Sequence, residues 1–138
     1  MHKVLKWLII DCMNFKIDTR EKFTMITPVS DFSSDNLTAE FKELVHSYLQ
    51  HKTNIVISLK NVVKLDEQAV ETLAALQQKF YEQNVSFVIC EVQLPVQAVV
   101  NSLDLDGVMN ITPTDTEAWD IVQMEEIERD LLGDEEIS

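Results

Sequence analysis

The sequence predicts a single α/β domain, in which an N-terminal hairpin and parallel βαβ units form a mixed sheet of about five strands covered by about four helices. Its 138 residues are enough for one hydrophobic core and too few for two. Hydrophobic residues make up 46% of the chain, which is ordinary for a globular domain. After residue 36, helical and strand-like patterns alternate, which is typical of parallel strands joined by right-handed helical crossovers.

The first two strands are predicted as a hairpin. Phe15 and Ile17 alternate with polar residues, and residues 23–27 alternate again after a polar turn at residues 18–22. Pro28 ends the second strand, because proline has no N–H to donate to a neighbouring strand.

Four stripes of apolar residues at helical spacing predict the four helices. Asp35 or Asn36 caps the first helix, and Asp66 precedes the second. Pro95 lies in the first turn of the third helix, and Thr114–Glu117 forms a capping box for the fourth. The expected inner faces are Phe41, Leu44, Val45, Tyr48 and Leu49; Val70, Leu73, Leu76 and Phe80; Val96, Val99, Val100 and Leu103; and Ala118, Ile121 and Val122.

The remaining strands lie between these helices. Ile55–Leu59 and Val85–Cys90 are nearly continuous apolar runs, which predict strands covered on both faces. Val108–Ile111 predicts a short last strand.

The net charge of −13 disfavours nucleic acid and anionic membrane surfaces as partners. Much of this charge lies between residues 115 and 138, where ten acidic residues accompany one basic residue, Arg129. The two glycines, Gly107 and Gly133, do not fit a phosphate-binding loop or a dinucleotide motif.

Cysteine usage and the N-terminus predict a protein of the reducing cytoplasm. Cys12 and Cys90 lie far apart and form no CxxC motif. The apolar residues 1–10 are interrupted by Lys6, are too few to span a membrane and precede no small-residue cleavage site. We therefore expect neither a signal peptide nor membrane insertion.

No pattern in the sequence predicts catalysis, a metal site or a cofactor. Asp104 and Asp106 lie in a segment typical of a turn. The thiol of Cys90 is expected to be buried and inert inside its apolar run. The chain has three histidines, His2, His46 and His51, and their spacing is not that of metal ligands.

Residues 54–92, NIVISLKNVVKLDEQAVETLAALQQKFYEQNVSFVICEV, resemble the centre of a STAS domain, the domain of small bacterial anti-sigma factor antagonists. The family pattern is a buried strand, an Asp-Ser-Ser/Thr-Gly turn, a helix and a second buried strand. Residues 94–119 resemble its usual ending, with a proline-opened helix, a short strand and an acidic capped helix. The resemblance covers about residues 15–122 and implies a STAS-like fold.

In that family the second hydroxyl residue of the turn is phosphorylated by a partner anti-sigma kinase, and the dephosphorylated form binds the kinase and frees the sigma factor. In this chain Asp66 matches the Asp of the turn, and Ala69 replaces the Gly. Glu67 and Gln68 replace the hydroxyl residues, so the phosphoacceptor position is held by Gln68, which cannot be phosphorylated. The partner-binding residues that the resemblance implies are Asp66, Glu67, Gln68, Ala69, Glu71 and Thr72.

The departures from the family turn have their own physical consequences. Glu67 either stabilises the start of a helix, by about 0.3–1 kcal/mol, or stands in for the phosphate and locks one signalling state. Ala69 raises helix propensity, which favours a constitutive binder over a cycling switch. Whether another hydroxyl, such as that of Thr72, takes a phosphate stays open.

The resemblance implies a non-enzymatic protein that binds an anti-sigma factor of the serine-kinase class and thereby regulates a sigma factor. The alternative is a structural STAS subunit of a lipid-transport ABC complex, which would bind the ATPase. A small-ligand-binding module is a third hypothesis, and it requires a pocket.

The sequence divides into an N-terminal extension at residues 1–12, the domain at residues 13–122 and an acidic helical tail at residues 123–138. The extension is either an upstream addition or an extra strand or clasp. In the tail, an apolar stripe is expected to lengthen the last helix before Gly133. This stripe packs on its own domain, packs on the mate in a homodimer or binds a partner, and its members are Met124, Ile127, Leu131 and Leu132.

Overall fold

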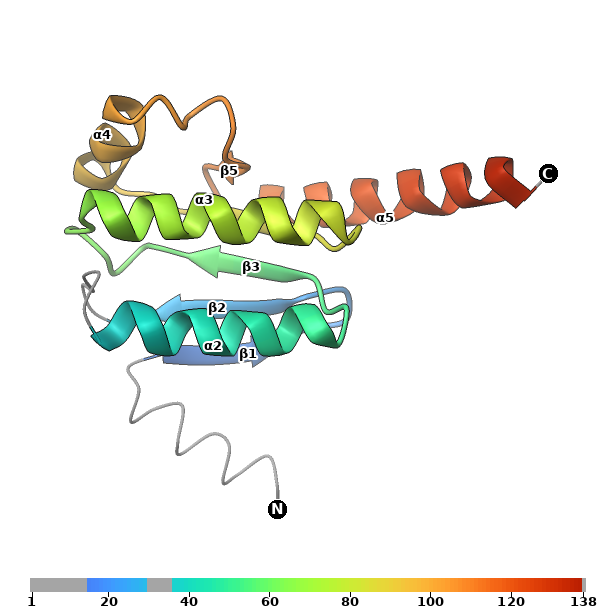
Figure 1. Cartoon of the computed structure of the whole chain (residues 1–138), viewed down its shortest axis with the longest axis horizontal. Helices are drawn as coiled ribbons and strands as arrows, with labels where there is room; N and C mark the ends of the chain where they lie inside the picture. The colour runs from blue at the N-terminus through green and yellow to red at the C-terminus, as the bar shows by residue number, and fades with distance from the viewer. Residues whose placement is uncertain (1–14, 30–35, 138) are drawn as a thin grey trace, which may run out of the picture.

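The computed structural model describes residues 15–29 and 36–137, which form one mixed sheet and its covering helices (Figure 1). The strands are β1 (Phe15–Thr19), β2 (Thr24–Pro28), β3 (Ile55–Ser58), β4 (Phe87–Cys90) and β5 (Ile111–Thr112). The helices are α2 (Asn36–Gln50), α3 (Glu67–Glu82), α4 (Leu94–Ser102) and α5 (Asp115–Ile137). The predicted fold class and order of elements are confirmed. The predicted extension at residues 1–12 lies outside the described residues.

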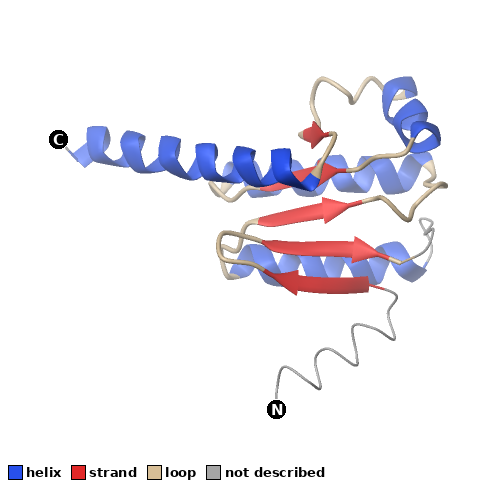
Figure 2. Cartoon of the chain, turned by 180° about the vertical axis from the view of Figure 1, so that it is seen from behind, coloured by secondary structure: helices blue, strands red, loops and turns tan. Residues whose placement is uncertain are grey.

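The order of strands in the sheet follows their order in the chain. β1 and β2 form the predicted antiparallel hairpin, with Ile17 opposite Ile26. From β2 to β5 all neighbouring strands are parallel. Parallel neighbours need a crossover, and α2, α3 and α4 supply it. Helices α2 and α3 cover one face of the sheet, and α5 lies on the other face (Figures 1 and 2).

Side chains of the central strands alternate between two hydrophobic clusters. Ile55 and Ile57 of β3 belong to the larger cluster, which includes buried residues of α2, α3 and α4. Val56, between them, points to the opposite face. The smaller cluster, packed with α5, contains Phe23, Met25, Val56, Val88, Cys90, Ala118 and Val122. The prediction that the apolar runs are covered on both faces is therefore confirmed.

The predicted strands at Ile55–Leu59 and Val85–Cys90 differ from β3 and β4 by one and two residues, and two other predicted boundaries are further off. The last strand is predicted to begin at Val108, but it begins at Ile111. Val108 is 58% exposed and lies in the turn before the strand. Helix α5 does not end before Gly133 but continues to Ile137. One interior glycine costs a helix roughly 0.5–1 kcal/mol, which is not enough to stop a helix already anchored along its first half.

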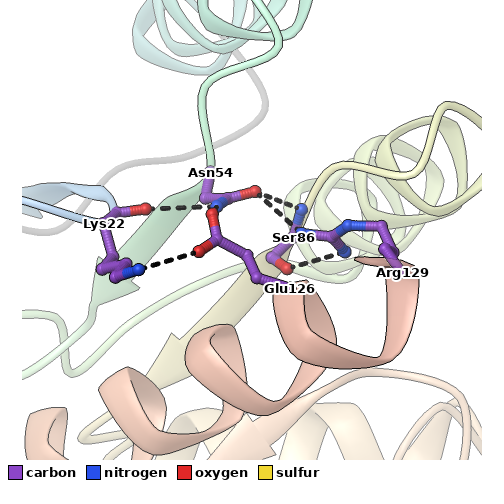
Figure 3. Close-up of polar contacts among 5 residues, drawn as sticks. All are labelled: Lys22, Asn54, Ser86, Glu126 and Arg129. Carbon is purple, nitrogen blue, oxygen red and sulfur yellow. Dashed lines mark hydrogen bonds and ion pairs between the residues drawn. The ribbon is translucent and has the colours of Figure 1, made fainter. Parts of the chain in front are cut away.

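Asn54, the residue before β3, joins three parts of the molecule (Figure 3). Its Nδ2 donates to the carbonyl of Lys22 at 3.1 Å and to the Glu126 carboxylate at 2.7 Å. Its Oδ1 accepts the Ser86 N–H at 2.9 Å and a longer bond from Arg129 at 3.5 Å. Asn54 is buried, and these four contacts use the whole donor and acceptor capacity of its amide.

Further polar contacts join α5 to the start of β4. The Ser86 hydroxyl donates to Glu125 Oε1 at 2.6 Å and accepts from Arg129 Nη1 at 3.3 Å. Lys22 Nζ lies 3.6 Å from Glu126 Oε1. Three charged residues of α5 therefore face the amino ends of the central strands, and these contacts fix which side of the helix faces the sheet.

Cys90 is completely buried at the end of β4. Burial, followed by the negative charges of Glu91 and Asp115, raises the pKa of its thiol to about 12. The thiolate is the reactive form of cysteine, so this thiol is inert at neutral pH.

We expect Asn54→Ala to lower the free energy of unfolding by about 2 to 3 kcal/mol, because the buried Ser86 N–H loses its acceptor and α5 loses two contacts. Urea unfolding followed by circular dichroism measures the change. Asn101→Ala, at an exposed position of α4, is the matched control and should change stability by less than about 0.5 kcal/mol. Equal effects of the two substitutions would contradict this role for Asn54.

We expect Cys90 in the Cys12→Ser variant to resist a thiol-specific reagent at pH 8, because only about one thiol in ten thousand is ionised four pH units below its pKa. Absorbance of the released chromophore follows the reaction. Unfolding in guanidinium chloride should release the full reactivity of one thiol. Rapid labelling of the folded protein would contradict the burial of this side chain.

Candidate functional site

The amino end of α3 forms a well-defined capped corner. Asp66 has an extended backbone, with φ −77° and ψ 168°, and its Oδ1 accepts the Ala69 N–H at 2.9 Å. Glu67 follows as the first helical residue, where a negative charge interacts favourably with the helix dipole. The prediction that Asp66 precedes the second helix is confirmed.

Apolar residues of the preceding loop hold this corner against the core. Val62 and Leu65 are both buried between β3 and α3, and the Val62 N–H donates to the Leu59 carbonyl at 3.0 Å. Beside them, Gln93 Nε2 donates to the Lys60 carbonyl at 2.6 Å, which joins the loop after β4 to the loop after β3. The corner therefore lies at the edge of the sheet where the parallel strands end.

The structure exposes most of the predicted partner-binding residues. The Ala69 side chain is buried, at 1% exposure, so this residue supports the corner from within and offers no side-chain surface. The Thr72 side chain is half-buried, and its hydroxyl donates to the Gln68 carbonyl at 2.9 Å. The residues exposed at the surface are Asp66, Glu67, Gln68 and Glu71.

A shallow groove of about 200 Å³ runs beside the corner, between α3 and α2. Gln68, Glu71 and Thr72 line it on α3, and Lys42 lines it from α2. This volume is small for a ligand pocket but suits a single side chain of a docked protein. Sequence reasoning missed Lys42, because only the packing of α2 against α3 brings it to this site.

Exposed apolar side chains surround the same edge of the sheet. Val29, Val63 and Leu94 are 43%, 44% and 84% exposed. Each follows the carboxyl end of one of the parallel strands β2, β3 and β4, so all three lie at the edge that carries Asp66. Apolar residues among polar ones are typical of a protein-binding surface. The position of these apolar residues could have been predicted from the sequence, since each of them follows a predicted strand.

Within residues 15–29 and 36–137, no group of His, Cys, Asp or Glu side chains is arranged to hold a metal ion. None of the helices in this range has both the length and the hydrophobicity that a bilayer-spanning segment requires. The larger cavity, of about 470 Å³, lies beside the carboxyl end of α3 and α5. Its polar lining includes Gln77, Glu125 and Arg129, which already hydrogen-bond within the protein.

Solved structures with the same fold are found among anti-sigma factor antagonists. A protein from Thermotoga maritima described as such an antagonist has a TM-score of 0.72 at 19% identity, covering 79% of this chain and 94% of the other. A STAS domain protein from Planctomyces limnophilus has a TM-score of 0.62 at 18% identity, covering 79% of this chain and 97% of the other. The anti-sigma factor antagonist SpoIIAA in its unphosphorylated form has a TM-score of 0.61 at 10% identity, covering 79% of this chain and 97% of the other. SLC26A9 contains the fold in 22% of its chain, with a TM-score of 0.64 at 15% identity over 84% of this chain.

The sequence itself is distant from these proteins. No curated protein sequence matches it. The STAS domain family nevertheless matches residues 14–118, a range that includes the whole sheet, the capped start of α3 and the first turn of α5. The match covers most of the chain and agrees with the order of strands and helices. The chain belongs to the STAS domain family.

Proposed function

We propose that this chain is a non-enzymatic bacterial anti-sigma factor antagonist of the cytoplasm, which binds an anti-sigma factor through the amino end of α3 and so regulates a sigma factor. The observation that carries the proposal is the exposed, capped corner at Asp66–Gln68, in the place where the family has its phosphorylated turn. The structural neighbours described as anti-sigma factor antagonists support the same assignment.

The chemistry of the corner favours constitutive binding. Gln68 has no hydroxyl, so no phosphate can be added at this position to interrupt the complex. The Asp66 cap and the buried Ala69 fix the start of the helix, so the surface is formed before the partner arrives. Preformed surfaces lose less conformational entropy on binding.

The surface suits an anti-sigma factor of the serine-kinase class with an apolar patch and basic residues. Exposed Val63 and Leu94 supply apolar contacts next to the corner. Glu67 and Glu71 supply exposed negative charge on the first turns of α3. Complementary charge at the edge of such an interface increases the association rate and the specificity of binding.

A role as the STAS subunit of a lipid-transport ABC complex is the second candidate. The match to 22% of the longer SLC26A9 chain supports this candidate, because there the same fold is one part of a larger protein. In this role the same corner would contact the ATPase, and the missing hydroxyl at Gln68 would have no effect.

We expect Gln68→Trp to weaken binding to the cognate anti-sigma factor by at least about a hundredfold, because a bulky ring at the centre of the corner prevents close approach. Isothermal titration calorimetry with the purified partner measures the affinity. Gln78→Trp, at an exposed position farther along the same helix, is the matched control and should leave the affinity within about twofold. Equal effects would place the interface elsewhere on the protein.

We expect ATP to leave the complex with an anti-sigma kinase intact, because the unmodified chain has no hydroxyl at position 68. In the Gln68→Ser variant, ATP should cause phosphorylation and release, since a phosphate adds about two negative charges at the interface. Size-exclusion chromatography detects release, and intact mass spectrometry detects the phosphate. Release of the unmodified chain by ATP would contradict constitutive binding.

A further inference from the structure

The outer face of α5 carries a stripe of large apolar side chains. Met124, Ile127 and Leu131 are 59%, 58% and 60% exposed. Spacings of three and four residues place them on one side of a helix, as in the seam of a coiled coil. Their exposure is a correction to one expectation from the sequence, because these three side chains do not pack on their own domain. The side chain of Leu132, the fourth residue of the predicted stripe, lies outside the described part of the chain.

The helix cannot rotate to bury this stripe. Its opposite side is already used, since Ala118 and Val122 are buried against the sheet. One and two turns farther on, Glu125 and Arg129 hydrogen-bond to Ser86 at the start of β4. The contacts of the inner side therefore fix the apolar stripe on the outer side.

The carboxyl-terminal part of α5 projects beyond the sheet (Figures 1 and 2). A helix of 23 residues is about 35 Å long, whereas the four residues of β3 span about 13 Å. The projecting part is therefore accessible to a second helix along its outer side.

The charges beside the stripe are all negative among the described side chains of α5. Asp120, Glu128 and Asp130 are exposed and lie next to the apolar residues on the helical wheel. Arg129, the one basic residue between residues 115 and 138, is turned inward and contacts Ser86 and Asn54. The outer face thus combines an apolar centre with acidic margins.

This combination determines what can cover the stripe. Two copies of α5 packed on each other would place acidic margins against acidic margins, which is destabilising. An anionic membrane surface would be repelled in the same way. A helix with apolar residues at matching spacing and Lys or Arg at its margins satisfies both the apolar centre and the charges.

We propose that the outer face of α5 is a second docking surface, which binds a basic amphipathic helix of a partner protein through Met124, Ile127 and Leu131. It is distinct from the corner that Asp66 caps, because the amino end of α3 lies at the opposite end of the sheet from the projecting part of α5 (Figure 1). The domain therefore has two surfaces that can be occupied at the same time.

The test uses the full chain and two synthetic peptides of about four heptads, both with leucine at the seam positions. One peptide has lysine at the flanking positions, and the other has glutamate. Fluorescence anisotropy should give a dissociation constant below about 100 μM for the lysine peptide at low salt, no binding of the glutamate peptide and weaker binding of the lysine peptide as salt increases.

Variants separate docking at the stripe from general attraction to an acidic protein. The triple substitution Met124→Gln, Ile127→Gln and Leu131→Gln keeps every charge and should weaken binding of the lysine peptide at least tenfold. Val108→Gln, at an exposed apolar position outside α5, is the matched control and should leave binding unchanged. Circular dichroism checks that each variant folds. Gln68→Trp should also bind the peptide normally, so failure at the first surface is distinguishable from failure at the second.

Three results would overturn the proposal. The triple variant could bind the lysine peptide as well as the unmodified chain does, which would indicate attraction by charge alone. The unmodified chain could bind neither peptide. Sedimentation could reveal a dimer that the triple variant abolishes, in which case the stripe is covered by a second copy of this chain.

Discussion

The position of α5 on its face of the sheet depends on the buried amide of Asn54. One side chain contacts the turn of the hairpin, the start of β4 and two residues of α5. A buried amide that uses all its donors and acceptors specifies geometry more strictly than apolar packing does, because any displacement leaves a polar group unpaired. The smaller hydrophobic cluster buries the inner side of α5, and the contacts of Asn54 fix the orientation of this helix.

Structural support and proposed binding are separated along the strands. The amino ends of β3 and β4 carry the polar network, whereas their carboxyl ends lead to Asp66 at the start of α3 and to the exposed Leu94 at the start of α4. The residues that fix the position of α5 are therefore not the residues proposed to contact partners. This separation explains how the turn at Asp66 can lose its hydroxyl residues without any cost to the arrangement of the sheet.

Local patterns predicted the fold well, whereas long-range polar contacts were not predictable. The alternation of apolar runs and helical stripes predicted five strands and four helices, and the cap at Asp66 began α3 as expected. The end of α5 is not predicted by Gly133, because the helix continues through this glycine to Ile137. Asn54 and Lys42 gave no signal, since their roles depend on residues that are distant in the chain. At the candidate site, Ala69 was predicted from the family turn, but its burial required the structure.

The brevity of β5 affects how this protein can meet others. A long exposed strand offers a row of unpaired amide and carbonyl groups on which a foreign strand can add, whereas β5 has two residues and offers almost none. Extension of the sheet by another polypeptide at that margin is therefore disfavoured. At that margin, recognition depends on side chains of helices and loops, whose identity can change without altering the hydrogen bonds of the sheet.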